Sequence, residues 1–143
     1  MKGWEVGAPQ DFAVFLRALP LLFSSPHWVL YLEAADTPPS IQTYLREHGT
    51  GSETRIPGGT LFPKPEVFHL PIAVETVVGL ASLLESIPAT SPPTHVHVYS
   101  DEGVALEWYD ASAGDPLRLS ESLDPERIAE FCERIGCSYR QQI

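Results

Sequence analysis

The clearest alternation of hydrophobic and polar residues lies in two stretches of the chain. In residues 27–33, Trp28, Leu30 and Leu32 alternate with His27, Tyr31 and Glu33, with Val29 as the exception on the second face. This period of two is typical of a half-buried β-strand. Residues 95–109 alternate in the same way on both sides of a turn that contains Gly103. The second stretch therefore predicts a β-hairpin.

Four other segments carry apolar residues at the spacing of an amphipathic helix. They lie at residues 11–22, 40–48, 74–87 and 124–135.

Residue types that favour the start or the end of a helix stand at the ends of these predicted helices. Asp11 and Asp124 can accept hydrogen bonds from the free N–H groups of a first helical turn. Gly49 and Gly136 suit the residue after the last turn, where glycine tolerates a left-handed conformation. Pro20 ends or kinks the first helix, because proline has no N–H to donate within a helix.

A further short strand is predicted at residues 66–70, and residues 116–119 form either a short strand or an extended piece. Pro71 suits the first turn of the helix that follows the strand at residues 66–70. The element order is then α-β-α-β-α-β-β-α. Right-handed crossovers between the first three strands would place their helices on one side of a single sheet. The residues after 138 are expected to fray.

We therefore expect one α+β domain over residues 1–143. It is a two-layer sandwich: a mixed sheet of about four to five short strands, with helices mainly on one face and a C-terminal β-hairpin plus helix. The other sheet face is left open. The segment at residues 50–65 is rich in Gly, Thr and Pro, and it fits either a loop or a twisted hairpin.

The turn of the hairpin predicts a three-residue loop with Gly103 in a left-handed bulge position. This loop fixes the register, in which the facing pairs are Ser100 with Val104, Val98 with Leu106, His97 with Glu107, Val96 with Trp108, and His95 with Tyr109. One hairpin face is apolar, and the other carries His95, His97, Tyr99, Glu107 and Tyr109. The first predicted strand adds Tyr31 and Glu33 to the same polar face, which His69 could join.

Three interpretations of this polar face remain open. In the first, it is structural, because His and Tyr suit a half-exposed sheet and a His97–Glu107 pair contributes roughly 0.2–1 kcal/mol. In the second, it binds another protein, since tyrosine offers a large rigid area with a hydroxyl group. In the third, it is a metal or acid/base site, in which His95 and His97 bind a metal and Glu107 or His69 supplies a third ligand. A His-x-His pair alone is a weak signal for a metal, because further ligands at fixed spacing are missing.

The chain carries nineteen acidic and nine basic residues among its 143, a formal net charge of -10. This charge disfavours nucleic acid, whose binding depends on Lys and Arg contacts to phosphates. It disfavours an anionic membrane surface for the same reason. A basic protein partner would be attracted, although the charge also serves solubility.

No other motif points to chemistry. Cys132 and Cys137 would point in different directions on one continuous helix, so we expect no disulfide and a buried Cys132. The glycines at 58 and 59 lack the lysine and spacing of a phosphate-binding loop. The apolar stretch at residues 12–23 contains Arg17 and Pro20 and does not read as an export signal. We expect a reduced, cytoplasmic protein without a cofactor.

The small size, the acidity and the aromatic sheet face resemble small bacterial immunity or antitoxin-like proteins that plug a basic toxin. This resemblance concerns only the general class of protein, and it assigns no site residue in this chain. We expect a non-enzymatic protein-binding domain that uses Tyr31, Glu33, His95, His97, Tyr99, Glu107 and Tyr109, or that self-associates through them. The alternatives are a small metal-dependent enzyme or metal sensor using His95, His97 and Glu107, and a small-ligand pocket beneath residues 50–65.

Overall fold

The computed structural model describes residues 3–25, 27–34, 37–50, 66–87 and 93–142. Its strands are β1 (Gly3–Val6), β2 (Val29–Ala34), β3 (Glu66–Pro71), β4 (His95–Ser100), β5 (Gly103–Trp108), β6 (Leu117–Ser120) and β7 (Tyr139–Gln142). Its helices are α1 (Phe12–Leu22), α2 (Pro39–His48), α3 (Val74–Glu85) and α4 (Pro125–Ile135), with a 3-10 turn, η1 (Ala111–Ala113). The predicted structure of residues 51–65 lies outside the described part of the chain.

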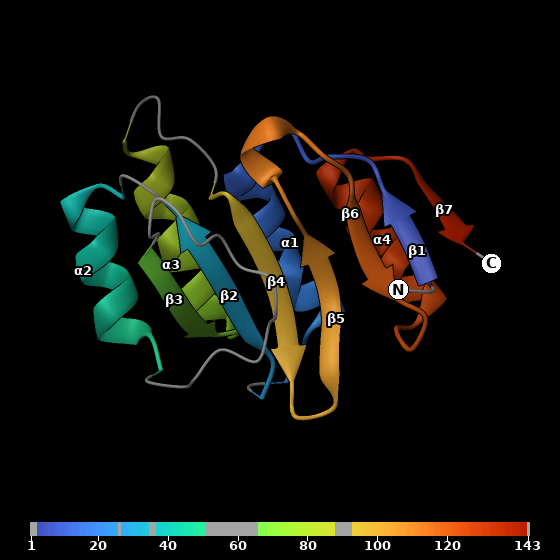
Figure 1. The fold of residues 1–143 in the computed structure, drawn as a ribbon, viewed down its shortest axis with the longest axis horizontal. Helices are drawn as coiled ribbons and strands as arrows, with labels where there is room; N and C mark the ends of the chain where they lie inside the picture. The colour runs from blue at the N-terminus through green and yellow to red at the C-terminus, as the bar shows by residue number, and fades with distance from the viewer. Residues whose placement is uncertain (1–2, 26, 35–36, 51–65, 88–92, 143) are drawn as a thin grey trace.

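The strands form one open sheet in the order β3-β2-β4-β5-β6-β1-β7, and every described pair is antiparallel. Helices α1, α3 and α4 lie behind the sheet, and α2 stands beside the β3 edge (Figure 1). The α+β class and the placement of the helices mainly on one face are confirmed. The mixed sheet of four to five strands is wrong, because β2 pairs antiparallel with both β3 and β4.

Two strands at the ends of the described chain were missed by the sequence analysis. β1 pairs with β6 on one side and with β7 on the other. Each of β1 and β7 has four residues, and β7 reads Tyr-Arg-Gln-Gln without an apolar alternation. The expected fraying after residue 138 is therefore replaced by a strand, which depends on β1 from the opposite end of the sequence.

The core lies between the sheet and the helices. A row of apolar side chains crosses six neighbouring strands in register: Leu70, Leu30, Val98, Leu106, Leu119 and Trp4. From the helices, Phe15 packs against Trp108 with ring centroids 5.0 Å apart, and against Phe131 at 6.1 Å. Full burial of such side chains contributes about 1.5–3 kcal/mol each, so this interface is the main source of stability.

The predicted helix ends are confirmed with three differences. Gly49 follows α2 as predicted, but with φ -78° it is extended rather than left-handed, whereas Gly136 after α4 is left-handed, with φ +69°. Asp11 accepts a hydrogen bond from the Val14 N–H at 3.1 Å, and Asp124 accepts one from the Glu126 N–H at 2.9 Å. Pro20 lies inside α1, which continues to Leu22. Pro71 is the last residue of β3 rather than part of α3, which begins three residues later.

The hairpin β4–β5 has the predicted register in its middle part, but β5 ends at Trp108, so the strand pairing does not include the predicted His95–Tyr109 pair. The pairs Val96–Trp108, His97–Glu107 and Val98–Leu106 are confirmed. Ser100, however, faces Gly103 instead of Val104, and the register shifts between Val98 and Tyr99. The extra residue of the hairpin is therefore Ala105 within β5, not Gly103 in the loop.

No helix in the described residues is long and apolar enough to cross a membrane.

Candidate functional site

One polar residue from every strand lies in a single row across the sheet, on the face opposite the helices. Each member faces the next in the strand pairing. From the β3 edge to the β7 edge, this polar row is His69, Tyr31, His97, Glu107, Arg118, Glu5 and Arg140. Since side chains alternate between the two faces of a strand, the row is the reverse side of the apolar core.

The two halves of the polar row differ in exposure. The three members on β3, β2 and β4 are buried aromatic or imidazole side chains. Among the four remaining members, Arg118 and Arg140 are exposed, and Glu107 and Glu5 are half-buried. Their charges alternate along the row, and Arg140 contacts Glu5 at 2.9 Å. One half of the face is thus a packed aromatic layer, and the other is a solvated ladder of opposite charges.

The buried half is held together by side-chain hydrogen bonds and ring contacts. The Tyr31 hydroxyl donates to Glu33 Oε2 at 3.0 Å. The Tyr31 ring stacks on His97, with centroids 5.5 Å apart and planes 25° from parallel. The Tyr99 hydroxyl and His69 Nδ1 are hydrogen-bonded at 2.8 Å. Buried polar groups that are paired in this way order the face instead of destabilising it.

The hydrogen bonds of His95 and His97 fix the proton on one ring nitrogen. The Asp110 N–H donates to His95 Nδ1 at 3.0 Å, and the Trp108 N–H donates to His97 Nδ1 at 3.3 Å. A nitrogen that accepts from a backbone N–H uses its lone pair, so the proton of the neutral ring sits on Nε2. Burial, together with the neighbouring His95, lowers the pKa of His97 to about 4. Both arguments favour a neutral His97 at pH 7.

This proton placement argues against a metal on the His-x-His pair. A metal at Nε2 would require the proton to move to Nδ1, where it would face the backbone N–H that now donates there. Within the described residues, no group of three His, Cys, Asp or Glu side chains is placed to hold a metal ion. The hypothesis of a metal-dependent site at His95, His97 and Glu107 gains no support from this geometry.

The seven residues predicted to bind a partner do lie together on this face, but most of them are not accessible. Five are buried: Tyr31, Glu33, His95, His97 and Tyr99. The expectation of an open face is therefore wrong for these five. Glu107 is half-buried, and Tyr109 keeps 38% of its surface exposed. Alternation along a strand identifies which side chains share a face, but it does not reveal whether that face reaches solvent. Partner binding stays a prediction.

Tyr109 is the exposed end of the aromatic layer. Its ring packs edge-on against His97 at 4.6 Å and against His95 at 5.3 Å. The next residue, Asp110, has φ +52°, a left-handed conformation that Asp tolerates better than most side chains. The Asp110 N–H points at His95. The sequence analysis missed this role of Asp110, and the only local signal was a polar residue directly after the strand.

Two carboxylates lie close enough to the Tyr109 hydroxyl to affect its pKa. Burial raises the pKa of this hydroxyl, and the carboxylates of Glu107 and Glu33 raise it further. The exposed Asp110 and Asp115 follow in the same loop, where the Asp115 N–H approaches the Asp110 carbonyl oxygen at 3.5 Å. An exposed aromatic ring thus stands in a negative environment.

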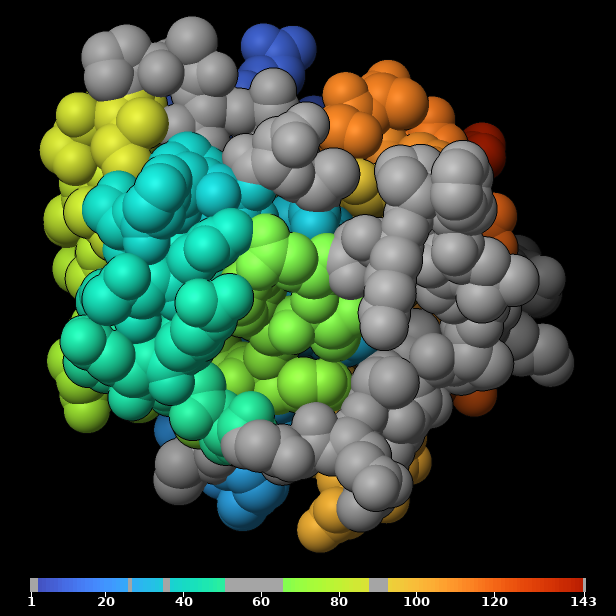
Figure 2. Space-filling view, turned by 60° about the vertical axis from the view of Figure 1, so that its left-hand side comes forward, coloured from blue at the N-terminus to red at the C-terminus, as the bar shows by residue number. Residues whose placement is uncertain are grey.

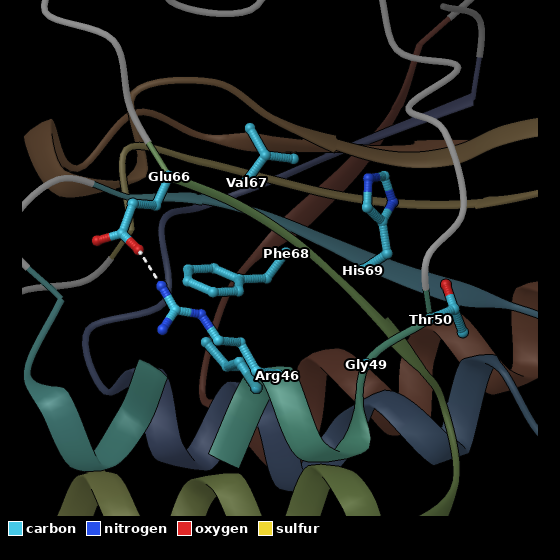
Figure 3. Close-up of a pocket in the computed structure, with 8 residues that line it drawn as sticks. Arg46, Gly49, Thr50, Glu66, Val67, Phe68 and His69 are labelled. Atoms are coloured by element: carbon cyan, nitrogen blue, oxygen red, sulfur yellow. Dashed lines mark ion pairs between the residues drawn. The ribbon is translucent and has the colours of Figure 1, made fainter. Parts of the chain in front are cut away.

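A second feature is a pocket of about 470 Å³ at the β3 edge. Figure 2 shows β3 reaching the surface next to α2. Arg46 and Glu66 form an ion pair of 3.6 Å across the pocket, and Phe68 lies between Arg46 and His69 (Figure 3). His69 belongs both to this pocket and to the polar row. Of the segment predicted to cover a ligand pocket, only Thr50 is described, and it lies at the pocket wall.

No family model, no curated protein and no solved structure matches this chain.

Proposed function

We propose that this chain is a non-enzymatic protein-binding domain that receives a basic side chain of its partner on Tyr109. The observation that carries the proposal is the exposed Tyr109 ring held against two buried imidazoles within an acidic surround. The binding surface consists of Tyr109, Glu107 and Asp110, and the buried His95 and His97 support the Tyr109 ring.

The position of Tyr109 favours binding because its ring is already ordered. Aromatic anchors dominate protein interfaces when they contribute a large area at a small loss of side-chain freedom. Contacts to His95 and His97 restrict the Tyr109 ring before any partner arrives. The ring therefore loses little entropy on binding, and its exposed surface is available for a partner.

The charge around Tyr109 favours a lysine or arginine in the partner. A cation over a tyrosine ring gains about 0.5–2 kcal/mol, with the larger values for desolvated contacts. The Glu107 carboxylate could pair with the same cation. The net charge of -10 would also steer a basic protein toward this domain over a longer range. The same charge disfavours self-association through this face, because a second copy would be equally acidic.

The test is a comparison of three proteins as baits: the wild type, Tyr109→Ala and Tyr139→Ala. Tyr139 is a matched control, because it is also an exposed tyrosine, at 42%, but it lies on β7 away from the proposed surface. We expect a basic protein that is retained by the wild type and by Tyr139→Ala and lost with Tyr109→Ala. The retained partner is then titrated calorimetrically against all three baits.

In that titration, we expect Tyr109→Ala to weaken binding at least tenfold and Tyr139→Ala to leave it unchanged. Binding to the wild type should also weaken as the salt concentration rises, because the surface charges become screened. Equal affinity of all three baits would reject the proposal, and so would the absence of any partner that discriminates between them.

A further inference from the structure

The two cysteines meet at the C-terminal end of α4, where the chain reverses. Gly136 adopts φ +69°, and its N–H approaches the Glu133 carbonyl oxygen at 3.2 Å. The Cys137 N–H reaches one residue further back and donates to the Cys132 carbonyl oxygen at 3.0 Å. These two bonds define a Schellman motif, in which Cys132 and Cys137 occupy the two positions whose side chains commonly touch.

Bond lengths limit how far apart the two cysteines can be. A Cα lies about 2.4 Å from its own carbonyl oxygen and about 1.5 Å from its own nitrogen. With a hydrogen bond of 3.0 Å between Cys132 O and Cys137 N, the Cα atoms are at most about 7 Å apart. The true separation is shorter, because these links are not collinear. Disulfides join Cα atoms about 4.4–6.8 Å apart, so the backbone distance suits a bridge.

The expectation that these cysteines point apart assumed one continuous helix, which Gly136 interrupts. Both thiols are free. Cys132 belongs to the buried core, and the half-buried Cys137 packs against that core. Burial, together with the charge that Cys137 would carry, raises the pKa of Cys132 to about 11. The charge of one thiolate therefore affects the other thiol, and the backbones of the two residues are joined by a hydrogen bond.

A small oxidant can reach Cys137 but not Cys132. Cys137 lines a surface hollow of about 280 Å³, together with Gly7, Gln10 and Ser138. Cys132 is 1% exposed and belongs to the core. The arrangement has one accessible thiol and one shielded thiol, which are the attacking and resolving groups that thiol–disulfide exchange requires.

We propose that Cys132 and Cys137 form a reversible intramolecular disulfide, with a small-molecule disulfide such as oxidised glutathione as the oxidant. The Cys137 thiolate attacks one sulfur of glutathione disulfide and releases one glutathione thiolate. The Cys132 thiolate then attacks Cys137 Sγ in the mixed disulfide and releases the second glutathione. The protein loses two electrons and two protons, and these convert the oxidant into two thiols.

The bridge would join the last turns of α4 to the segment that leads into β7. The Gly7 N–H already donates to the Ser138 carbonyl oxygen at 2.9 Å, next to Cys137. Oxidation should therefore hold the β1–β7 edge more firmly against α4. Because the pKa values of both thiols are raised, the reaction should be slow at neutral pH and accelerate as the pH rises.

The test incubates the reduced full-length chain with excess oxidised glutathione and follows its intact mass. We expect the wild type to lose two hydrogen atoms, to carry no glutathione and to react with no alkylating agent after denaturation. Peptide mapping should find residues 132 and 137 cross-linked, and dithiothreitol should restore both thiols. Amide hydrogen exchange in β7 should be slower in the oxidised form.

Two serine variants separate the roles of the cysteines. Cys132→Ser should stop at a mixed disulfide with one glutathione on Cys137, because the resolving thiol is missing. Cys137→Ser should stay unmodified in the folded state, because Cys132 is shielded. A wild type that retains glutathione, that links to a second chain or that stays fully alkylatable in excess oxidant would overturn the proposal.

Discussion

Gly79 and Tyr44 share one position between α3 and α2. A Cβ on Gly79 would lie 2.3 Å from the Tyr44 hydroxyl oxygen and 3.2 Å from its ring carbon Cζ. That hydroxyl donates to the Thr76 carbonyl oxygen at 2.8 Å. The missing side chain of a helical glycine thus makes room for the tyrosine that connects α2 to α3.

We predict that Gly79→Ala destabilises the protein by about 1 kcal/mol. Alanine gains about 1 kcal/mol of helix propensity, but displacing Tyr44 loses a hydrogen bond and well-packed contacts. Denaturant unfolding of Gly79→Ala, Tyr44→Phe and the double variant checks this. The two effects should be less than additive, because both changes remove the same hydrogen bond. Strict additivity would mean that the two residues do not compete for this space.

Replacing Gly49 by alanine is predicted to cost more stability than replacing Gly79. Its Cβ would lie 2.5 Å from the Leu45 carbonyl oxygen and 2.9 Å from that of His69, and both are backbone atoms with little freedom to move. Gly49→Ala should therefore cost on the order of 2 kcal/mol. It should also disturb the hydrogen bond from the Thr50 N–H to the His69 carbonyl oxygen.

Gly7→Ala is the matched control for Gly49→Ala, since the nearest atom would lie 3.6 Å from its Cβ. Its unfolding free energy should stay within about 0.5 kcal/mol of the wild type. A loss of the same size in both variants would show that the tight contacts at Gly49 do not determine the outcome.

Stability should fall as the pH drops from about 6.5 toward 4. The folded protein holds the pKa of His97 at about 4, against 6.5 in an unfolded chain, so the unfolded state binds the proton first. The contribution of His97 is thus complete above pH 6.5 and decreases below it, by roughly 3 kcal/mol at most. Burial also lowers the pKa of His69, which adds to the trend.

His97→Asn is the variant that isolates this effect. Asparagine can still accept from the Trp108 N–H through its side-chain oxygen, but it does not titrate. Urea unfolding of both proteins between pH 7 and pH 4.5 should show a shallower loss of stability in the variant. Parallel pH profiles would contradict the assignment to His97.

Asp124→Ala should lose about 1 kcal/mol, because its side chain accepts from the Glu126 N–H at the start of α4. Glu130→Ala, at an exposed position of the same helix, should change stability by less than about 0.5 kcal/mol. The midpoints of denaturant unfolding of these two variants, each compared with the wild type, test this prediction. Equal losses of stability in the two variants would indicate that the hydrogen bond accepted by the Asp124 side chain does not stabilise α4.

The hairpin could be predicted from sequence because its signals are local. Alternation along β4 and β5 and a turn between them are enough to place His97 opposite Glu107. The extra residue of the hairpin was assigned to the wrong position, because a glycine in the turn is the residue type that favours a bulge. In the structure, the extra residue is Ala105, which lies within β5, where the alternation of the sequence gives no sign of a bulge.

The rest of the candidate site depends on long-range pairing. Glu5 and Arg140 come from opposite ends of the sequence, and nothing near either residue indicates the other. The proton positions on His95 and His97 depend on the Asp110 and Trp108 amides, whose directions follow from the folded backbone. Residue types therefore predicted the members of the polar face on β2, β4 and β5, but not Arg118, Glu5 and Arg140, and neither the burial nor the protonation of the face.

The central place of β1 between β6 and β7 has a consequence for the order of folding. Strand β1 is synthesised first among the strands, yet both of its partners belong to the last quarter of the chain. Until those residues emerge, β1 has neither neighbour, while β2, β3, β4 and β5 can already pair. Contacts of such large sequence separation slow folding. We therefore expect the β6–β1–β7 edge to assemble last and to be the first part of the sheet to open.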